Sequence, residues 1–151
     1  VENNEIHVPG AGILVAGDAN YWFESGAVGD LVIRGNLFDN CNYGIWGRAA
    51  VDINPEIEKR HRAGQRYHHN IVIEGNVFKA FDGRVVRAHC VQGLSILNNR
   101  IEPSDAYPPR FVDAEPFDVE DCSLVEIANN SPTGARLERA GHMSGGTGTP
   151  A

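Results

Sequence analysis

A short phrase recurs five times along this chain and constrains its fold more than any other feature. The phrase consists of an aliphatic residue, two variable residues and an asparagine, and it ends at Asn4, Asn36, Asn76, Asn99 and Asn130. The asparagines are therefore separated by 32, 40, 23 and 31 residues. Self-similarity with a period of about 20–50 residues is the sequence signature of solenoid and array proteins. We therefore expect a stack of similar units.

The segments around the asparagines have the composition of β-strands. Those before the asparagines are short, alternating and rich in β-branched residues, and they comprise Leu31–Ile33, Ile71–Ile73, Leu94–Ile96 and Leu124–Ile127. A second set follows the asparagines, at Gly12–Val15, Gly44–Trp46 continuing to Ala50–Ile53, Gly83–Val86 and Phe111–Val112. The first three of this set begin 8, 8 and 7 residues after their asparagine, whereas a proline-rich insertion at 102–109 delays the fourth.

These strands fit a right-handed parallel β-helix better than any other all-β arrangement. The chain has neither two-residue hairpin turns nor 10–15-residue amphipathic helices between them, which argues against meanders and βαβ units. We expect about four to five coils over residues 1–130, with adjacent strands about 4.8 Å apart. The asparagines could bond to one another in an internal ladder, as in stacked β structures. The alternative is that they are turn residues of an all-β sandwich.

Composition excludes several classes of protein. The chain has 151 residues, which suffices for one domain, and a net charge of −7. It contains no basic run with interleaved aromatic residues, so a nucleic-acid partner is not expected. It contains no apolar stretch of roughly 18 residues, so no membrane span is expected. The three cysteines, Cys41, Cys90 and Cys122, lack the spacing of a disulfide framework or zinc site and are interpreted as small buried hydrophobic residues.

The two ends of the chain differ from its repetitive middle. Residues 131–151 lose the repeat and become rich in Gly, Ser, Thr and Pro, which predicts a flexible tail. At the other end the phrase begins at Val1 without a capping segment. Because solenoids need polar capping units, the sequence is interpreted as the C-terminal part of a longer β-helix.

The first candidate site is the loop Gly17–Gly26, which follows a predicted strand. It combines two carboxylates, which we take as candidate catalytic groups, with polar and aromatic residues suited to bind a sugar. The catalytic candidates are Asp18 and Glu24, and the substrate-binding candidates are Asn20, Tyr21 and Trp22. Alternatively, Trp22 and Phe23 cover the edge of the coil while Asp18 caps a turn.

A second long loop, residues 54–70, follows the equivalent strand of the next coil, so stacking should place the two loops side by side. Its candidate substrate contacts are Glu56 and His68. The alternative is a solvated excursion, given its many charged residues. No metal site or cofactor is expected, because adjacent residues such as His68 and His69 point to opposite faces of a strand. Asp52 and Asp82 are interpreted as structural.

These residues resemble the α-1,3-galactosidases of glycoside hydrolase family 110. The resemblance covers roughly residues 1–130 and is carried by four segments. They are Gly17–Gly26, Ile33–Phe38, Ile53–Ile57 and Tyr67–Ile71. The first segment is the most specific of the four, because many parallel β-helix proteins share the coil phrases.

The resemblance implies an inverting, metal-independent hydrolase that removes terminal α-1,3-linked galactose. It also implies that the main catalytic aspartates, including an adjacent Asp-Asp pair, lie N-terminal to this segment, since the chain contains no such pair. The chain would then form a wall of the substrate site, with Asp18, Trp22 and Glu24 as contacts. It further implies export from the cell, so a secreted or periplasmic location is expected.

Three alternatives stay open beside the hydrolase. The chain could be a glycan-binding module without catalysis, or a purely structural solenoid. It could also be a relative of polygalacturonases or pectate lyases. Because lyases of that type need a calcium cluster of acidic ligands on the sheet face, and no such cluster is expected on these strands, this alternative ranks lower. The oligomeric state is not predicted.

Overall fold

The computed structural model describes residues 1–17, 19 and 25–132, and in this range the protein is all-β. Thirteen strands form three sheets, and the chain visits the sheets in turn. Sheet A consists of β3 (Gly29–Arg34), β6 (His68–Glu74), β9 (Val91–Leu97) and β12 (Ser123–Ala128). Sheet B consists of β1 (Glu5–Ile6), β4 (Leu37–Asp39), β7 (Val77–Ala80), β10 (Arg100–Pro103) and β13 (Ser131–Pro132). Sheet C consists of β2 (Ile13–Val15), β5 (Val51–Ile53), β8 (Val86–His89) and β11 (Phe117–Glu120).

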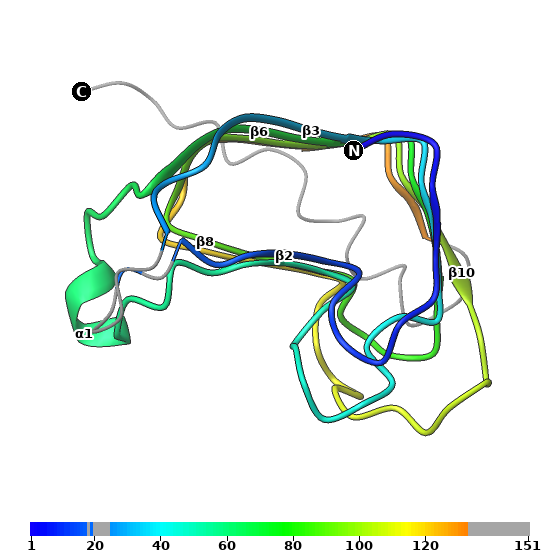
Figure 1. The fold of residues 1–151 in the computed structure, drawn as a ribbon. Helices are drawn as coiled ribbons and strands as arrows, with labels where there is room; N and C mark the ends of the chain where they lie inside the picture. Colours follow the sequence, from blue (N-terminus) through cyan, green and yellow to red (C-terminus); the bar gives the residue numbers. More distant parts are fainter. Residues whose placement is uncertain (18, 20–24, 133–151) are drawn as a thin grey trace.

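Every strand pair in the three sheets is parallel. Each strand pairs with the equivalent strand of the preceding pass through the sheets, of the following pass, or of both. We call one pass through the three sheets a coil. Figure 1 shows the coils superimposed, with sheets A and C facing each other and sheet B closing one side. The all-β prediction is confirmed, and the three parallel sheets are compatible with a parallel β-helix.

The interior is filled by aliphatic and aromatic side chains in register. Ile33, Ile73 and Ile96 stack in sheet A and are completely buried. In sheet B, the rings of Phe38 and Phe78 stack with their centroids 4.8 Å apart. Since a buried isoleucine or phenylalanine contributes about 1.5–3 kcal/mol of hydrophobic stabilisation, these columns provide much of the free energy that holds the coils together.

The predicted asparagine ladder is present at the turn between sheets A and B. The side-chain oxygens of Asn36, Asn76, Asn99 and Asn130 each accept from the backbone N and the Nδ2 of the preceding asparagine, over 2.9–3.0 Å. Asn36, Asn76 and Asn99 are each 1 % exposed. Each Nδ2 in the ladder also donates to a backbone carbonyl, so these buried amides are hydrogen-bonded through both ends.

The residue before each ladder asparagine is less variable than the sequence suggested. In all five phrases it has a positive φ, between 55° and 64°, at Asn3, Gly35, Gly75, Asn98 and Asn129. Only glycine and, to a lesser degree, asparagine visit this left-handed region without a large steric cost. The turn therefore favours these two residue types at this position.

The second set of predicted strands is only partly correct. Gly12–Val15 and Ala50–Ile53 largely match β2 and β5, but Gly44–Trp46 forms a bend, and β8 begins three residues after the predicted start at Gly83. Phe111–Val112 is not a strand, because the insertion is longer than expected and β11 begins only at Phe117.

Asp82 explains where the insertion ends. Its Oδ1 accepts from the backbone N of Phe111 at 2.7 Å, and its Oδ2 accepts from the backbone N of Arg110 at 3.3 Å. The end of the insertion is thereby held as a loop against the turn after β7, which confirms a structural role for Asp82. The predicted tail begins inside β13, and its remaining residues, 133–151, lie outside the described range.

All three cysteines are free, as expected. Cys41 and Cys90 are buried, and Cys122 is half-buried. Burial is the main cause that raises the pKa of each of the three thiols, so all three are held in the protonated form. Among the described residues, no helix has the length and apolar character that crossing a membrane would require.

Candidate functional site

The outward face of sheet C is flanked by connecting loops on two sides. The segments from sheet C to sheet A include α1 (Lys59–Arg62), and the segments from sheet B to sheet C lie at the opposite edge. Figure 1 shows the segment with α1 and the segments from sheet B to sheet C projecting beyond sheet C, on the side away from sheet A. Loops held on a rigid scaffold are where binding and catalytic residues concentrate. The outward face of sheet C, between these loops, is therefore the candidate location of a functional site.

The two long loops lie beside each other at their described ends, as predicted. The backbone N of Ala19 donates to the carbonyl of Pro55 at 2.9 Å, and the Tyr67 hydroxyl donates to the carbonyl of Gly17 at 3.0 Å. Gly17 has a φ of +76°, and a Cβ there would collide with the Tyr67 ring. A glycine is therefore required where the first loop leaves sheet C.

Most of the predicted site residues lie outside the described residues. This applies to both catalytic candidates and to three substrate-binding candidates, namely Asp18, Glu24, Asn20, Tyr21 and Trp22. Their roles stay predictions.

Glu56 is on the surface of the second loop. Its side chain is exposed, its φ is 61°, and its backbone N donates to Asn54 Oδ1 at 3.2 Å. Asn54 therefore stabilises an unusual backbone conformation that presents Glu56 outward, and a substrate contact by Glu56 remains a prediction.

His68 lies inside the fold. Its side chain is 0 % exposed, and its Nδ1 accepts from the backbone N of Val28 at 3.0 Å. Burial lowers the pKa of His68, and the nearby Ala16 backbone opposes this effect. Among the described residues, Nε2 has no hydrogen-bond partner. The ring also packs against Gly17. Contact between His68 and a sugar would require this packing to open, so its predicted binding role has no support from its position.

The outward face of sheet C carries a row of charged side chains that the sequence analysis did not identify as a site. Asp52, Arg87 and Asp118 are aligned on β5, β8 and β11. Arg87 donates to both oxygens of Asp52, over 2.7 and 2.9 Å, and Arg84 pairs with Asp118 at 3.3 Å. Asp52 is 1 % exposed, and this two-bond pairing confirms its predicted structural role.

The next outward position on the same strands holds His89 and Glu120, which are also in register. Arg62 reaches them from α1: its Nη1 lies 2.7 Å from His89 Nδ1 and 3.3 Å from Glu120 Oε2. Burial, followed by the nearby Arg62 cation, lowers the pKa of His89, while Asp118 and Glu120 oppose the shift. The His89 ring is therefore neutral near pH 7.

His89, Asp118 and Glu120 bring one nitrogen and two carboxylate oxygens within 4.8 Å of one another. The sequence analysis did not identify this group, which has fewer acidic ligands than the calcium cluster of a pectate lyase would need. The arrangement also fits a metal ion poorly. Because an arginine can only donate, Arg62 takes the lone pair of His89 Nδ1 and leaves the proton of the neutral ring on Nε2. A protonated Nε2 cannot bind a metal.

The two carboxylates are also poorly placed to act as an inverting catalytic pair. Their oxygens lie within 4.8 Å of each other, whereas inverting glycosidases keep their two carboxyl groups about 6.5–9.5 Å apart to admit a water molecule. The cluster is therefore better suited to hold a polar group than to break a glycosidic bond. A signal for it existed in the alternation Arg87-Ala-His89 and Asp118-Val-Glu120, which places polar residues on one face of two strands.

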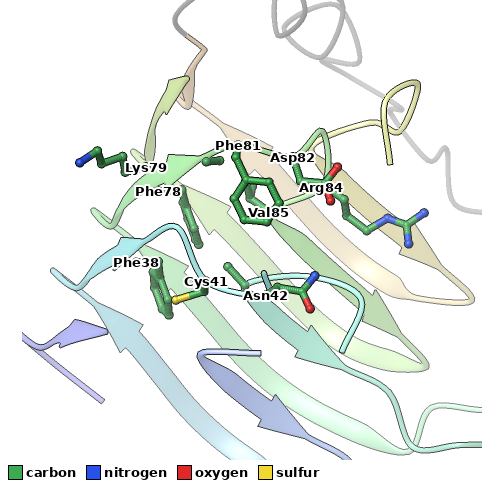
Figure 2. Close-up of a pocket in the computed structure, with 11 residues that line it drawn as sticks. Phe38, Cys41, Asn42, Phe78, Lys79, Phe81, Asp82, Arg84 and Val85 are labelled. Carbon is green, nitrogen blue, oxygen red and sulfur yellow. The ribbon is translucent and has the colours of Figure 1, made fainter. Parts of the chain in front are cut away.

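Two cavities lie beside the connections between sheets B and C. Figure 2 shows the smaller one, with the Phe38 and Phe78 rings on one side and Asn42, Asp82 and Arg84 on the other. Its volume is about 10 Å³, which holds one water molecule at most. The larger one is an open depression of about 430 Å³ lined by Phe81 and residues 104–109. Neither is lined by the charged residues of sheet C.

These features define a class: a repetitive all-β protein with a charged sheet face between loops, an arrangement suited to polar ligands.

No family model matches the chain. Comparison with curated proteins is more specific. The chain is 39% identical over 142 residues to α-1,3-galactosidase B of Bacteroides thetaiotaomicron, covering 92% of this chain and 23% of the relative. It is 36% identical over 126 residues to α-1,3-galactosidase B of Akkermansia muciniphila, covering 82% and 16%. It is 37% identical over 130 residues to α-1,3-galactosidase A of Shewanella woodyi, covering 86% and 21%.

The resemblance stated from the sequence is thus confirmed: this chain is homologous to one region of the α-1,3-galactosidases. It spans only 16–23% of the length of these curated relatives.

Proposed function

We propose that this chain is part of the right-handed parallel β-helix of an inverting exo-α-1,3-galactosidase, an exported enzyme that removes terminal α-linked galactose from glycans. The observation that carries the proposal is the 36–39% identity to several α-1,3-galactosidases over most of the chain. The parallel winding of the three sheets supports the β-helix.

In this proposal the chain contributes substrate binding, and the catalytic acid and base come mainly from other coils. The spacing of Asp118 and Glu120 supports this division, since it is too short for an inverting pair. Asp18 and Glu24 remain the candidates within the chain for a carboxyl that acts together with groups elsewhere. The first long loop would then form a wall beside the charged face of sheet C, because its described ends contact the second loop.

The test is a galactose-release assay on the full-length protein with a terminal α-1,3-galactoside, followed by proton NMR. We expect the first product to be β-galactose, because inversion at an α-linkage yields the β-anomer. The 151-residue chain alone is expected to release none. Release of α-galactose would refute the inverting mechanism, and no release from any α-1,3-galactoside would refute the activity.

A further inference from the structure

We propose that His89, Asp118 and Glu120 form a subsite on the outward face of sheet C that binds a hydroxyl group of a neutral sugar, with His89 Nε2–H as the donor and the two carboxylates as acceptors. The proposal deepens the function proposed above and rests on it for the class of ligand. The residues are not proposed as catalytic groups.

The hydrogen bond with Arg62 determines which ring nitrogen of His89 carries the proton. Arg62 Nη1 lies 2.7 Å from His89 Nδ1, and a guanidinium has no lone pair to offer. The hydrogen bond therefore runs from Arg62 to Nδ1, and the proton of the neutral ring is on Nε2. Protonation of both nitrogens would place two donors against each other at this contact.

The Nε2 proton of His89 has no hydrogen-bond acceptor among the described residues. His89 is 6 % exposed, and its Nε2 is buried without a hydrogen bond. The nearest carboxylate oxygens are those of Asp118 at 3.8 Å and Glu120 at 3.9 Å, both beyond hydrogen-bonding distance. A buried donor left in this state is unfavourable, and a native structure requires a reason for it.

The surroundings of Nε2 determine which chemical group can bind there. A hydroxyl group can accept from Nε2–H and donate to a carboxylate at the same time. A metal ion or a cationic group has no lone pair with which to accept from Nε2–H, and an anion would be repelled by the two carboxylates. Adjacent hydroxyls of one sugar ring would use both acids, since the acids lie on the same side of the histidine in register on β11.

Access to this donor depends on Glu120. The Glu120 side chain is 40 % exposed, compared with 22 % for Asp118 and 8 % for His89. Its ion pair with the exposed Lys59, at 3.9 Å, is close to solvent, whereas its contact with Arg62, at 3.3 Å, is more buried. A movement of Glu120 is therefore the least costly way to admit a ligand to Nε2.

The experiment measures ring nitrogens directly. The 151-residue chain, labelled with ¹⁵N-histidine, is titrated with methyl α-galactoside and with an α-1,3-linked galactose disaccharide while the His89 signals are followed by NMR. We expect the free protein to show the Nε2–H tautomer and the sugar to shift Nε2 more than Nδ1. An Nδ1–H tautomer, or saturation of the same signals by Zn²⁺ instead of sugar, would overturn the proposal.

Matched variants separate binding from folding. Asparagine can replace Nδ1 but has no donor at the Nε2 position, so His89→Asn should weaken sugar binding at least tenfold. Glutamine places an amide donor near the Nε2 position, so His89→Gln should retain most of the affinity. Glu120→Gln, at a more exposed site, should also weaken binding. His61→Asn, on the exposed part of α1, should leave affinity unchanged. Equal affinity of wild type, His89→Asn and Glu120→Gln would rule the subsite out.

Failure of the subsite can be distinguished from failure of the proposed function. If the full-length protein releases galactose and its His89→Asn variant has an unchanged KM, the subsite is wrong and the function stands. If no α-1,3-galactoside is hydrolysed, the function is wrong, and the titration of the chain still decides whether the subsite binds a sugar hydroxyl.

Discussion

The stacked asparagines show how one residue type can determine a fold. Asn76 occupies a central rung: its Oδ1 accepts from the N and Nδ2 of Asn36, and its Nδ2 donates to Ile33 O and to Asn99 Oδ1, all over 2.9–3.0 Å. A smaller side chain would leave these buried groups without partners. We therefore expect Asn76→Ala to lower the free energy of unfolding by about 1–3 kcal/mol, measured by denaturant titration.

Asn4→Ala provides the matched control, because Asn4 is exposed and bonds to only one other asparagine of the ladder among the described residues. It should cost clearly less than Asn76→Ala. Equal losses, or no loss at Asn76, would mean that the ladder contributes little to stability.

At the scale of residues, the sequence predicted the asparagine ladder but not the positive φ of the residue before each ladder asparagine. The asparagines were recognisable because five of them share one flanking pattern. The positive φ before each rung could not be recognised as a rule, since glycine and asparagine look like two unrelated choices until the turn shows that both satisfy one backbone angle. The same limit applies at Leu124, which has a φ of 52° although its sequence suggests an ordinary strand residue.

At the scale of elements, α1 contacts sheet C through two cations, of which Arg62 is the more buried and Lys59 the more exposed. Arg62 is 12 % exposed and contacts His89 and Glu120, which belong to two different strands. A charge-assisted hydrogen bond of this kind contributes about 1.5–3 kcal/mol, so Arg62→Ala should increase local opening of residues 54–67 roughly tenfold or more. Hydrogen exchange of the loop amides would measure this opening.

Arg60→Ala is the control for this prediction. Arg60 has the same charge on the same helix, but it is 74 % exposed and its ion pair, at 2.7 Å, is with Glu58, two residues away in the same segment. Its replacement should leave exchange in the loop nearly unchanged. Similar exchange in both variants would contradict an anchoring role for Arg62.

Prediction of the elements succeeded where a strand adjoins the repeated asparagine phrase. The strands of sheet A were located correctly because their aliphatic residues directly precede the asparagine. The strands of sheet B were missed, because they have only two to four residues and directly follow the asparagine, so that they read as the end of the repeated phrase. The fourth strand of sheet C was misplaced, because its position depends on where the insertion ends. That end is set by the hydrogen bond between Asp82 and Phe111, which are 29 residues apart in sequence.

For the whole molecule, the buried histidines predict how stability depends on pH. Burial lowers the pKa of both His68 and His89 below the ordinary value of 6.5. In the folded state these rings resist protonation, whereas in the unfolded chain they gain a proton near pH 6.5. The unfolded state therefore binds more protons below pH 6.5, and the free energy of unfolding should fall as the pH is lowered from 6.5 towards the folded pKa values.

Thermal unfolding between pH 8 and pH 5 would measure this effect, since the range lies above the ordinary pKa of carboxylates. We expect Tm to be constant above about pH 7 and to fall below pH 6.5. The double variant His68→Asn, His89→Gln should show a smaller decline. A Tm of the wild type that rises on acidification would contradict the predicted sign.

The asparagine ladder also gives the stack a direction. In every rung the amide oxygen faces the coil that comes earlier in the chain, and the amide nitrogen faces the coil that follows. Any stack built this way has unlike ends: the amide oxygens face one end and the amide nitrogens face the other. Two such stacks meeting at like ends would oppose oxygen to oxygen or donor to donor. Further coils, or a second molecule, can extend the row only head to tail, so the ladder acts as a polarity rule for assembly.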